Sequence, residues 1–381
     1  MLAAAALFNL GQGVLRPTMP LYLRDVFSAN YRMVTSIPTV FGLGKWLASL
    51  PTGYVLDRLG RRSLMAGGLV LIAASDLASA MTSAYPVFLG LRALAGVGWA
   101  MFGTAATTIV VDRQAAERRG RTVSLLLMSE TSGLLLGSAA GGWLYQALGA
   151  ASPFVFEAAC VLVSAVVVGA WVPRAGENSV PQKSGARRLL PGVLRTPGVL
   201  LMSVINAALI AIQTGVLVFL FPLYLVTRGG AGPDTVGVIV SLGVLGRLLT
   251  LWLGGSLSDR WGRTRVLIPG LLIYAVLLGS LALLTRPLAL GLWSLAIGGA
   301  AGLVAGLPTA LVGDRVPPPL QAVAVGWLRT VTDSGQILGP LVMGAVADAV
   351  DLSAPFVLAA LMLIVAAWQC ARRIRAISAP L

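Results

Sequence analysis

Residues 53–62 read GYVLDRLGRR, and residues 255–264 read GSLSDRWGRT. Both stretches contain a glycine, an Asp-Arg pair, and a second glycine followed by arginine, at identical spacing. Asp57 of the first stretch corresponds to Asp259 of the second, an offset of 202 positions (259 − 57). A charged segment repeated at long range indicates an internal duplication of the chain.

The same offset recurs along the whole sequence. It relates PLYL at Pro20 to PLYL at Pro222, and PFV at Pro153 to PFV at Pro355. Further pairs at this offset are Lys45 and Arg247, Asp112 and Asp314, Gly133 and Gly335, and Gly137 and Gly339. Chance similarity between apolar sequences does not keep one register, without a net gap, over so many elements. The sequence therefore predicts two homologous halves.

The composition places these halves in a membrane. Of the 381 residues 57% are hydrophobic and only 11% are charged, and a soluble protein of this length could not bury that much apolar surface. The apolar residues form runs of about twenty, the length that crosses a bilayer core as a helix. These runs lie near residues 1–22, 34–56, 63–84, 86–111, 119–147, 153–172, 199–226, 235–257, 265–285, 287–312, 320–347 and 354–371.

The runs predict an all-helical membrane protein with twelve transmembrane helices in two six-helix bundles. We place the N-terminal bundle at residues 1–172 and the C-terminal bundle at 199–381. Residues 173–198 are polar, basic and rich in glycine and proline, which is typical of a cytoplasmic linker that lies partly on the lipid surface. Because six is an even number, both bundles enter the membrane from the same side.

The net charge of +14 would suggest nucleic-acid binding in a soluble protein, but here it is a topology signal. Most of the 28 Lys and Arg residues lie in the loops after even-numbered runs and in the C-terminal tail. The opposite loops contain Arg24, Arg32, Arg228 and Arg286. The positive-inside rule therefore predicts a multi-pass protein of the cell (inner) membrane with both termini in the cytoplasm. We expect no nucleic-acid partner.

Several function classes are disfavoured. The chain has no histidine, so it has no Ser-His-Asp triad and any proton coupling must use carboxylates. Cys160 and Cys370 lie in apolar sequence, which suggests neither a disulfide framework nor a metal site. No GxxxxGK[ST] loop is present. We expect no enzyme activity, cofactor or metal. The first run lacks a basic flank, so we expect no cleaved signal peptide, and Met1 already lies within this run, which leaves open a short lead before it.

The repeated loop resembles motif A of the major facilitator superfamily. The first copy comprises Gly53, Asp57, Arg58, Gly60 and Arg61, and the second comprises Gly255, Asp259, Arg260, Gly262 and Arg263. The glycines allow a tight turn and close helix approach. The carboxylate can cap a helix of the other half, and the arginines can pair with Asp112 or Asp314. Such contacts would latch the cytoplasmic side shut. The alternative is a solvated, positively charged turn.

The stretch LRALAGVG at residues 91–98 resembles motif B of that superfamily, whose arginine is implicated in proton coupling. An arginine within hydrocarbon is costly and faces a partner or a cavity. Counting the helical rise places Asp76, Arg92 and Glu130 at similar depth, roughly 20 Å from the cytoplasmic face. We predict Glu130 as the partner of Arg92 and as the proton carrier, with Asp76 as the second choice. A permanent structural ion pair is the alternative.

The glycines Gly133 and Gly137 resemble motif C of the antiporter branch, although the usual proline is Ser138 here. Small-residue helix packing also explains this pattern. In the second half, Arg329 and Asp333 lie four residues apart on one helix face. They neutralise each other or line the cavity, and Asp333 is a further proton-coupling candidate. Because the resemblance places helices 1 and 7 along the pathway, we select as cavity candidates Asn9, Gln12, Arg16, Asn206 and Gln213. Arg329 of the eleventh run is a further cavity candidate.

Three further charged positions fall within apolar runs. Lys45 and Arg247 are equivalent in the repeat, so we predict a shared structural role at the interface between the halves. Glu157 lies about one turn into the sixth run, where it could reach the outer interface or simply snorkel.

The resemblance implies alternating access to a central site. We expect a proton-coupled antiporter that exports a small amphipathic compound and acts as a monomer, with a small-molecule substrate, protons and membrane lipids as partners. The first run lacks the acidic residue that many multidrug members place there, which weakens a cationic-drug assignment. The alternatives are a transporter of a polar metabolite, such as a sugar or organic anion, and a transporter-like receptor without flux.

Overall fold

The computed structural model describes residues 2–113, 116–171, 191–193, 196, 198–317 and 320–373. Within these ranges, side chains are described except at 2, 50, 53–59, 106–113, 116–127 and 322. The described residues are almost entirely helical and contain no strand. The prediction of an all-helical chain is therefore confirmed for this part of the protein.

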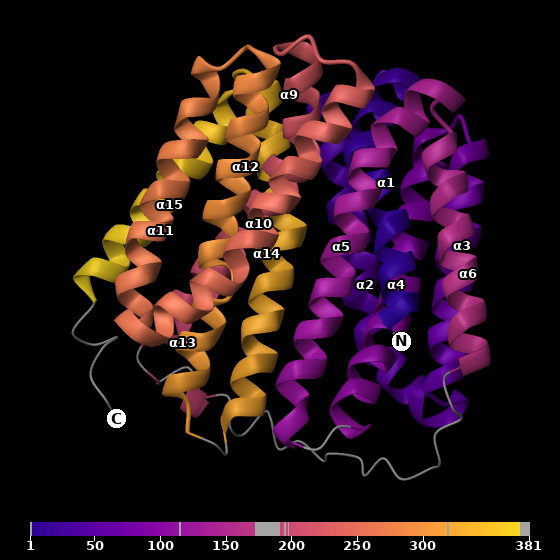
Figure 1. Cartoon of the computed structure of the whole chain (residues 1–381). Coiled ribbons are helices and arrows are strands. Elements are labelled where there is room, and N and C mark those ends of the chain that lie inside the picture. Colours follow the sequence, from indigo (N-terminus) through magenta and orange to yellow (C-terminus); the bar gives the residue numbers. More distant parts are fainter. Residues whose placement is uncertain are drawn as a thin grey trace. The chain divides into compact units, whose positions relative to one another are not determined.

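Every apolar run predicted from the sequence overlaps a helix of the described residues (Figure 1). The helices of the first half are α1 (Leu2–Phe27), α2 (Tyr31–Leu59), α3 (Arg61–Met81), α4 (Tyr85–Arg113), α5 (Ala116–Leu148) and α6 (Ser152–Trp171). Those of the second half are α8 (Val199–Ala211), the π-helical segment η1 (Ile212–Leu220), α9 (Phe221–Thr227), α10 (Pro233–Trp261), α11 (Arg263–Ser280), the 3₁₀ turn η2 (Leu281–Leu283), α12 (Pro287–Val304), α13 (Leu307–Arg315), α14 (Gln321–Ala349) and α15 (Ala354–Arg372).

Eight helical stretches among the described residues are long and apolar enough to cross a membrane. They are Arg61–Met81, Tyr85–Ala105, Ser152–Trp171, Val199–Thr227, Pro233–Trp261, Arg263–Leu283, Pro287–Arg315 and Ala354–Arg372. Helices α1, α2, α5 and α14 are not among these eight. Helix α14 carries Arg329, Asp333 and Gln336 along its middle, which makes it less apolar than its neighbours.

The chain divides into two compact units. The first comprises Met1–Val180 with Gly230–Ser241, and the second comprises Pro181–Gly229 with Leu242–Leu381. In the first unit α1 lies against α5 and α6, α3 lies against α4 and α6, and α2 lies against α4. In the second unit α8 lies against α14, and α11 lies against α12 and α15. The predicted domain boundaries at residues 172 and 199 stay a prediction.

The internal repeat is visible in individual contacts. The hydroxyl of Tyr22 on α1 donates a hydrogen bond to the backbone oxygen of Ser79 at 3.1 Å. In the second unit, Tyr224 makes the same bond to the backbone oxygen of Leu281, also at 3.1 Å. Both residues of the second bond lie 202 positions after those of the first, which is the offset of the repeated loop. The duplication in sequence is thus a duplication of packing.

Glycines bring α1 and α5 into backbone contact. A methyl group added to Gly133 would overlap the carbonyl oxygen of Ala6, and one added to Gly137 would overlap that of Leu10. The two glycines are four residues apart, so they lie on one face of α5 and let the backbones approach closely. The predicted small-residue packing is therefore confirmed.

The second unit repeats this contact between α8 and α14, with a change of register. A methyl group on Gly335 would overlap the carbonyl oxygen of Ala207, and one on Gly339 would overlap Ala211. These partners lie 201 positions after Ala6 and Leu10, whereas the tyrosine further along the helix keeps the offset of 202. The segment η1 lies between them, and a π-bulge accommodates one extra residue within a helix.

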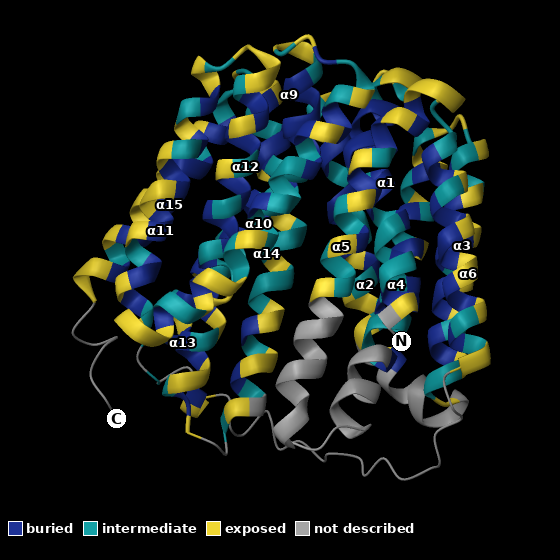
Figure 2. Cartoon of the chain, in the orientation of Figure 1, coloured by how far each residue is buried: buried dark blue, intermediate teal, exposed yellow. Residues whose placement is uncertain are grey.

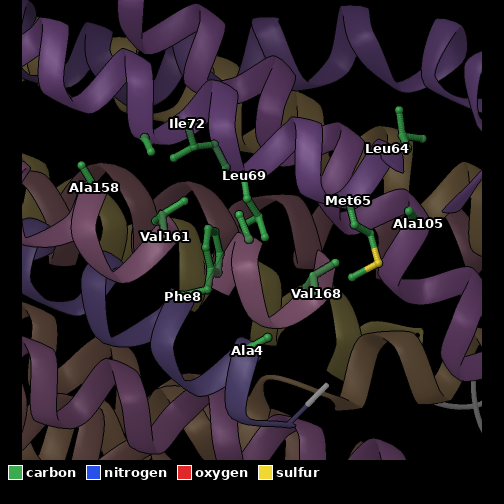
Figure 3. Close-up of a cluster of buried hydrophobic side chains, with 12 residues drawn as sticks. Ala4, Phe8, Leu64, Met65, Leu69, Ile72, Ala105, Ala158, Val161 and Val168 are labelled. Carbon is green, nitrogen blue, oxygen red and sulfur yellow. The ribbon is translucent and has the colours of Figure 1, made fainter. Parts of the chain in front are cut away.

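The apolar interior of the first unit is formed mainly by α1, α3 and α6 (Figure 3). Phe8 lies among these helices, and its ring centroid is 5.0 Å from that of Phe102 on α4. The cluster around it consists of Ala4, Leu64, Met65, Leu69, Ile72, Ala73, Ala105, Ala158, Val161, Ala165 and Val168. Buried and exposed residues alternate along each helix (Figure 2), as expected for helices with one face toward a protein interior.

Candidate functional site

Among the side chains that the structure describes in the first unit, those of two acids and one arginine are buried. Asp76 on α3 and Glu157 on α6 are 0% exposed, and Arg92 on α4 is 4% exposed. All three lie within about two turns of the helix ends on the side of the α3–α4 connection. Charged groups are expensive at such positions and mark solute or proton pathways in membrane proteins. We call these three residues the buried charge cluster.

Arg92 is bound by the face of α3. Its Nη2 lies 2.8 Å from Oδ1 of Asp76, and it donates to Oγ of Ser79 at 2.7 Å and to the backbone oxygen of Ser75 at 3.1 Å. Positions 75, 76 and 79 share one face of α3 because they are spaced by three and four residues. The side chain of Arg92 is therefore neutralised by a single carboxylate and oriented by two serines.

The prediction that Glu130 is the partner of Arg92 is wrong. Asp76, the second choice, takes that position, while Glu130 lies half-buried on α5. Counting residues from helix ends estimates depth in the membrane but not the direction in which a side chain leaves the helix. Helix α4 packs mainly against α2 and α3, so the acid on α3 is the one that meets Arg92. A role for Glu130 in proton coupling stays a prediction.

Aromatic rings enclose the guanidinium. The Cζ of Arg92 is 5.4 Å from the ring centroid of Phe88 and 5.5 Å from that of Phe154. Tyr22 packs edge-on against Phe154 with a centroid distance of 4.7 Å. These rings give cation–π attraction to Arg92 and exclude water around it. The ion pair with Asp76 is consequently held in an apolar environment.

Glu157 is held by α1. Gln12 donates a short hydrogen bond from Nε2 to Oε1 of Glu157, whereas Oε2 is buried without a hydrogen-bond partner in the described structure. Glu157 also interacts electrostatically with Asp76 and Arg92. It does not snorkel to the interface, so that interpretation is wrong. The signal that could have identified it is helical spacing, because the buried face of α6 comprises Pro153, Phe154, Glu157, Ala158, Cys160, Val161, Ser164, Ala165 and Val168.

The other predicted cavity residues lie on α1 and in the second unit. Asn9 donates to the backbone oxygen of Ala5 at 3.0 Å, and Arg16 is half-buried on the same helix. In the second unit, Asn206 donates to Oγ1 of Thr332 at 2.7 Å and so connects α8 with α14. Gln213 is half-buried in the π segment η1.

The acid and base of α14 differ in exposure. Arg329 is exposed and Asp333 is half-buried. Their mutual neutralisation, and the role of Asp333 in proton coupling, stay predictions.

The repeated loop makes the predicted tight turn in both units. Gly60 has φ 76° and Gly262 has φ 91°, a left-handed conformation that glycine adopts without strain. Each is the residue before a helix, α3 or α11. Gly255 has open space where a Cβ would lie, so close helix approach does not require glycine there.

The second copy of the loop forms the predicted ion pair. Arg263 makes a short contact from Nε to Oδ2 of Asp314 at the end of α13. Its Nη1 also lies 3.4 Å from Oδ1 of Asp259, four residues earlier, while Arg260 and Gly262 are exposed and Arg61 is half-buried. The side chains of Gly53, Asp57, Arg58 and Asp112 lie outside the described residues.

The equivalent basic residues Lys45 and Arg247 have different neighbours. The Nζ of Lys45 lies 4.7 Å from the ring centroid of Trp99, and Arg247 interacts electrostatically with Tyr274. Their shared role at an interface between the halves stays a prediction.

One ion pair lies outside the membrane helices. Nη2 of Arg228 is 2.9 Å from Oδ1 of Asp351, and both side chains are exposed. Slight burial raises the pKa of Asp351, but hydrogen bonds from Arg228 and Ser353 outweigh it and the pKa lies below its ordinary value of 3.8. This pair therefore persists over the physiological pH range.

The side chains that the structure describes include no group of three or more His, Cys, Asp and Glu residues able to hold a metal ion. Cys160 and Cys370 are both free and buried.

Comparisons with known proteins agree over the whole length. The family model described as Major Facilitator Superfamily matches residues 1–232 and 204–380. The quinolone resistance protein NorA of Staphylococcus aureus is 23% identical over 373 residues, covering 93% of this chain and 90% of the relative. The multidrug resistance protein MdtG of Citrobacter koseri is 25% identical over 373 residues, covering 94% of this chain and 91% of the relative.

A solved structure shows the same fold. The crystal structure of the nucleoside transporter NupG resembles this chain with a TM-score of 0.79 at 14% identity, covering 98% of each chain. Since the family model matches both homologous halves, the chain belongs to the major facilitator superfamily of multi-pass membrane transporters.

Proposed function

We propose that the protein is a secondary active transporter that exports a small amphipathic compound in exchange for protons. The observation that carries this proposal is the buried charge cluster, because two carboxylates and one guanidinium inside membrane helices are costly unless they serve a pathway. The relatives named for quinolone and multidrug resistance, at 23% and 25% identity, support export of such a compound.

The architecture that we propose for this function has twelve membrane-spanning helices. They form two six-helix bundles, at residues 1–172 and 199–381, with a cytoplasmic linker at 173–198 and both termini in the cytoplasm. The bundles alternate access to a central site by rocking, and the protein acts as a monomer among membrane lipids. The distribution of basic residues supports this orientation.

The repeated loop would latch the cytoplasmic side in this mechanism. Arg263 contacts both Asp259 and Asp314, so the loop between α10 and α11 is fastened to the end of α13. Both contacts are at the surface, where ion pairs contribute about 1 kcal/mol or less. A latch of this strength can open within a transport cycle.

The solute would contact polar residues on α1, on the α8–η1–α9 helix and on α14. The candidates are Asn9, Gln12, Arg16, Asn206, Gln213 and Arg329. Among them, Gln12 is hydrogen-bonded to a member of the buried charge cluster. A solute that competes for the Gln12 amide would therefore act directly on the buried charge cluster, which is the simplest form of coupling.

Proteoliposomes with an imposed pH gradient test the proposal. With an acidic interior, a fluorescent quinolone should accumulate inside as protons leave, and a protonophore should abolish the accumulation. Protein-free liposomes are the control. Quinolone movement at the same rate with and without the pH gradient contradicts proton coupling. Transport of a sugar or organic acid in its place indicates a metabolite transporter, and quinolone binding without movement indicates a receptor.

A further inference from the structure

The charges within the buried charge cluster do not balance. Arg92 donates its hydrogen bonds to Asp76, Ser79 and Ser75 on α3, so it is the counter-ion of Asp76. Glu157 is equally buried, but it receives its hydrogen bond from a neutral amide, that of Gln12. With both acids ionised, the cluster has a net charge of −1 inside the membrane. A single proton makes it neutral.

The groups around Glu157 identify where that proton resides. Gln12 approaches from α1, Asp76 from α3 and Arg92 from α4, while Cys160 is a neighbour on its own helix. On α5, the hydroxyl of Tyr145 donates to Asp25 at 2.8 Å. Burying an ionised carboxylate without a counter-ion is far more costly than burying the neutral acid. Because Arg92 is bound to Asp76, the acid that is neutral in this conformation is Glu157.

The repeat shows that the fold does not need these charges. The positions 202 residues after Asp76, Arg92 and Glu157 are Leu278, Ser294 and Ala359. All three are buried, with exposures of 0%, 2% and 0%, and the neighbouring contact of Tyr224 matches that of Tyr22. The same place in the same fold is thus filled by uncharged residues. A structural role therefore does not explain the cluster.

The apolar interior beside the cluster limits how the proton can leave. Phe8, Leu69, Ile72, Ala158 and Val161 fill the space between α1, α3 and α6 next to Glu157 and Asp76 along those helices (Figure 3). Such a dry layer offers no hydrogen-bonding path for a proton. Release through this layer therefore requires a change in the packing of α1, the helix that carries Gln12.

We propose that Glu157 is the residue that binds and releases the coupled proton, while Asp76 stays paired with Arg92 as a fixed charge. This inference rests on the proposed function of proton-coupled transport. The Glu157 carboxyl loses one proton to water and becomes a carboxylate when the hydrogen bond from Gln12 changes. It takes up one proton from water before the hydrogen bond from Gln12 forms again and the cluster becomes dry. The cluster carries one exchangeable proton in each cycle.

Two measurements on the full-length protein test this inference. Infrared difference spectra taken across a pH titration should show one protonated-carboxyl band in the wild type, and Glu157→Gln should remove it. In proteoliposomes, Glu157→Gln should lose quinolone accumulation driven by the pH gradient while it retains quinolone exchange, because glutamine mimics the protonated acid. The retained exchange also shows that the variant is folded. Asp351→Asn, at an exposed ion pair outside the membrane helices, is the control and should behave as the wild type.

The outcomes separate this inference from the proposed function. If Glu157→Gln keeps both the infrared band and gradient-driven accumulation, the inference is overturned and the transport function stands. If Glu130→Gln removes the band instead, the coupled proton belongs to α5 and the inference is equally overturned. If the wild type shows the band but no gradient-driven movement of any solute, Glu157 remains the buried protonated acid and the proposed function fails.

Discussion

Arg92 is surrounded by groups from α3, α4 and α6. A carboxylate, a serine hydroxyl and a backbone carbonyl bind it from α3, and two phenylalanine rings cover its faces. Its loss would leave Asp76 buried in an apolar environment without its counter-ion. Breaking one partner of a buried ion pair is much more damaging than removing both.

We therefore expect Arg92→Gln to lower the free energy of unfolding by about 3–5 kcal/mol. Arg92→Gln combined with Asp76→Asn should recover most of that loss, because no unpaired charge remains. Thermal and denaturant unfolding of the purified protein in detergent measures both. Equal destabilisation of the single and double variants would show that the unpaired charge of Asp76 is not the cause of the lost stability.

At the residue scale the sequence predicted the presence of the site better than its geometry. Arg92 stands out because an arginine within an apolar run is costly and marks a buried partner or a pathway. Its partner could not be predicted, since depth along a helix leaves the rotation of each side chain about the helix axis undetermined. Glu157 was misassigned because it lies near a helix end, where an acid can reach water. The helical spacing of Phe154, Glu157 and Val161 was the available signal.

The packing of α1 against α5 in the first unit depends on glycines, which leave room for the backbone of the other helix. At Gly137 of α5 a Cβ would overlap the carbonyl oxygen of Leu10 on α1, so the two helices must separate to accept any larger residue. Gly90 on α4 offers a matched comparison, because nothing lies within 4 Å of the position of its Cβ.

We expect Gly137→Ala to lower the free energy of unfolding by about 1–3 kcal/mol, the usual cost of overpacking. Gly90→Ala should leave the stability of the protein unchanged or slightly increased, because alanine favours helix. Unfolding midpoints in detergent compare the two. Similar midpoints for both variants would mean that α1 and α5 can separate to accept a methyl group without a loss of stability.

At the element scale the helices could be predicted and their irregularities could not. Runs of apolar residues give the position of each helix, because only a hydrogen-bonded backbone is stable in hydrocarbon. The π segment at Ile212–Leu220 has no compositional signature, since it differs from an α-helix in hydrogen-bond register alone. The interruption between α12 and α13 is marked in the sequence by Gly306 and Pro308, but an apolar run of this length does not by itself predict a break.

The second unit has uncharged residues at the positions equivalent to the buried charge cluster of the first unit. Leu278, Ser294 and Ala359 occupy in the second unit the positions of the three charged residues of the first. Replacing a buried ionic group completely by packed neutral residues is often neutral or stabilising, by up to about 4 kcal/mol. The second unit shows that such a set of side chains is compatible with the fold.

We expect the triple variant D76L/R92S/E157A to fold with stability equal to or above that of the wild type, yet to lose gradient-driven transport. Unfolding in detergent and quinolone accumulation in proteoliposomes measure the two properties. Retention of gradient-driven transport would place the coupling residues elsewhere in the molecule. Loss of folding would assign the charges a structural role that the repeat argues against.

At the scale of the whole molecule, the constant offset predicted two similar halves, and the paired contacts of Tyr22 and Tyr224 agree with it. The constant offset also hides a local shift of one residue in the second half. An alignment without a net gap does not show that α8 meets α14 one residue earlier than expected. That shift becomes visible only when the contacts of each helix are compared.

The π segment shows how a duplicated helix can diverge without losing its place. Its two ends are fixed, one by the glycines of α14 and the other by the bond from Tyr224 to Leu281. A single additional residue between them is taken up as a local widening, and the contacts at both ends are kept. Insertion of one residue is thus a way in which one half of a repeat protein can change a helix locally and keep its packing on either side.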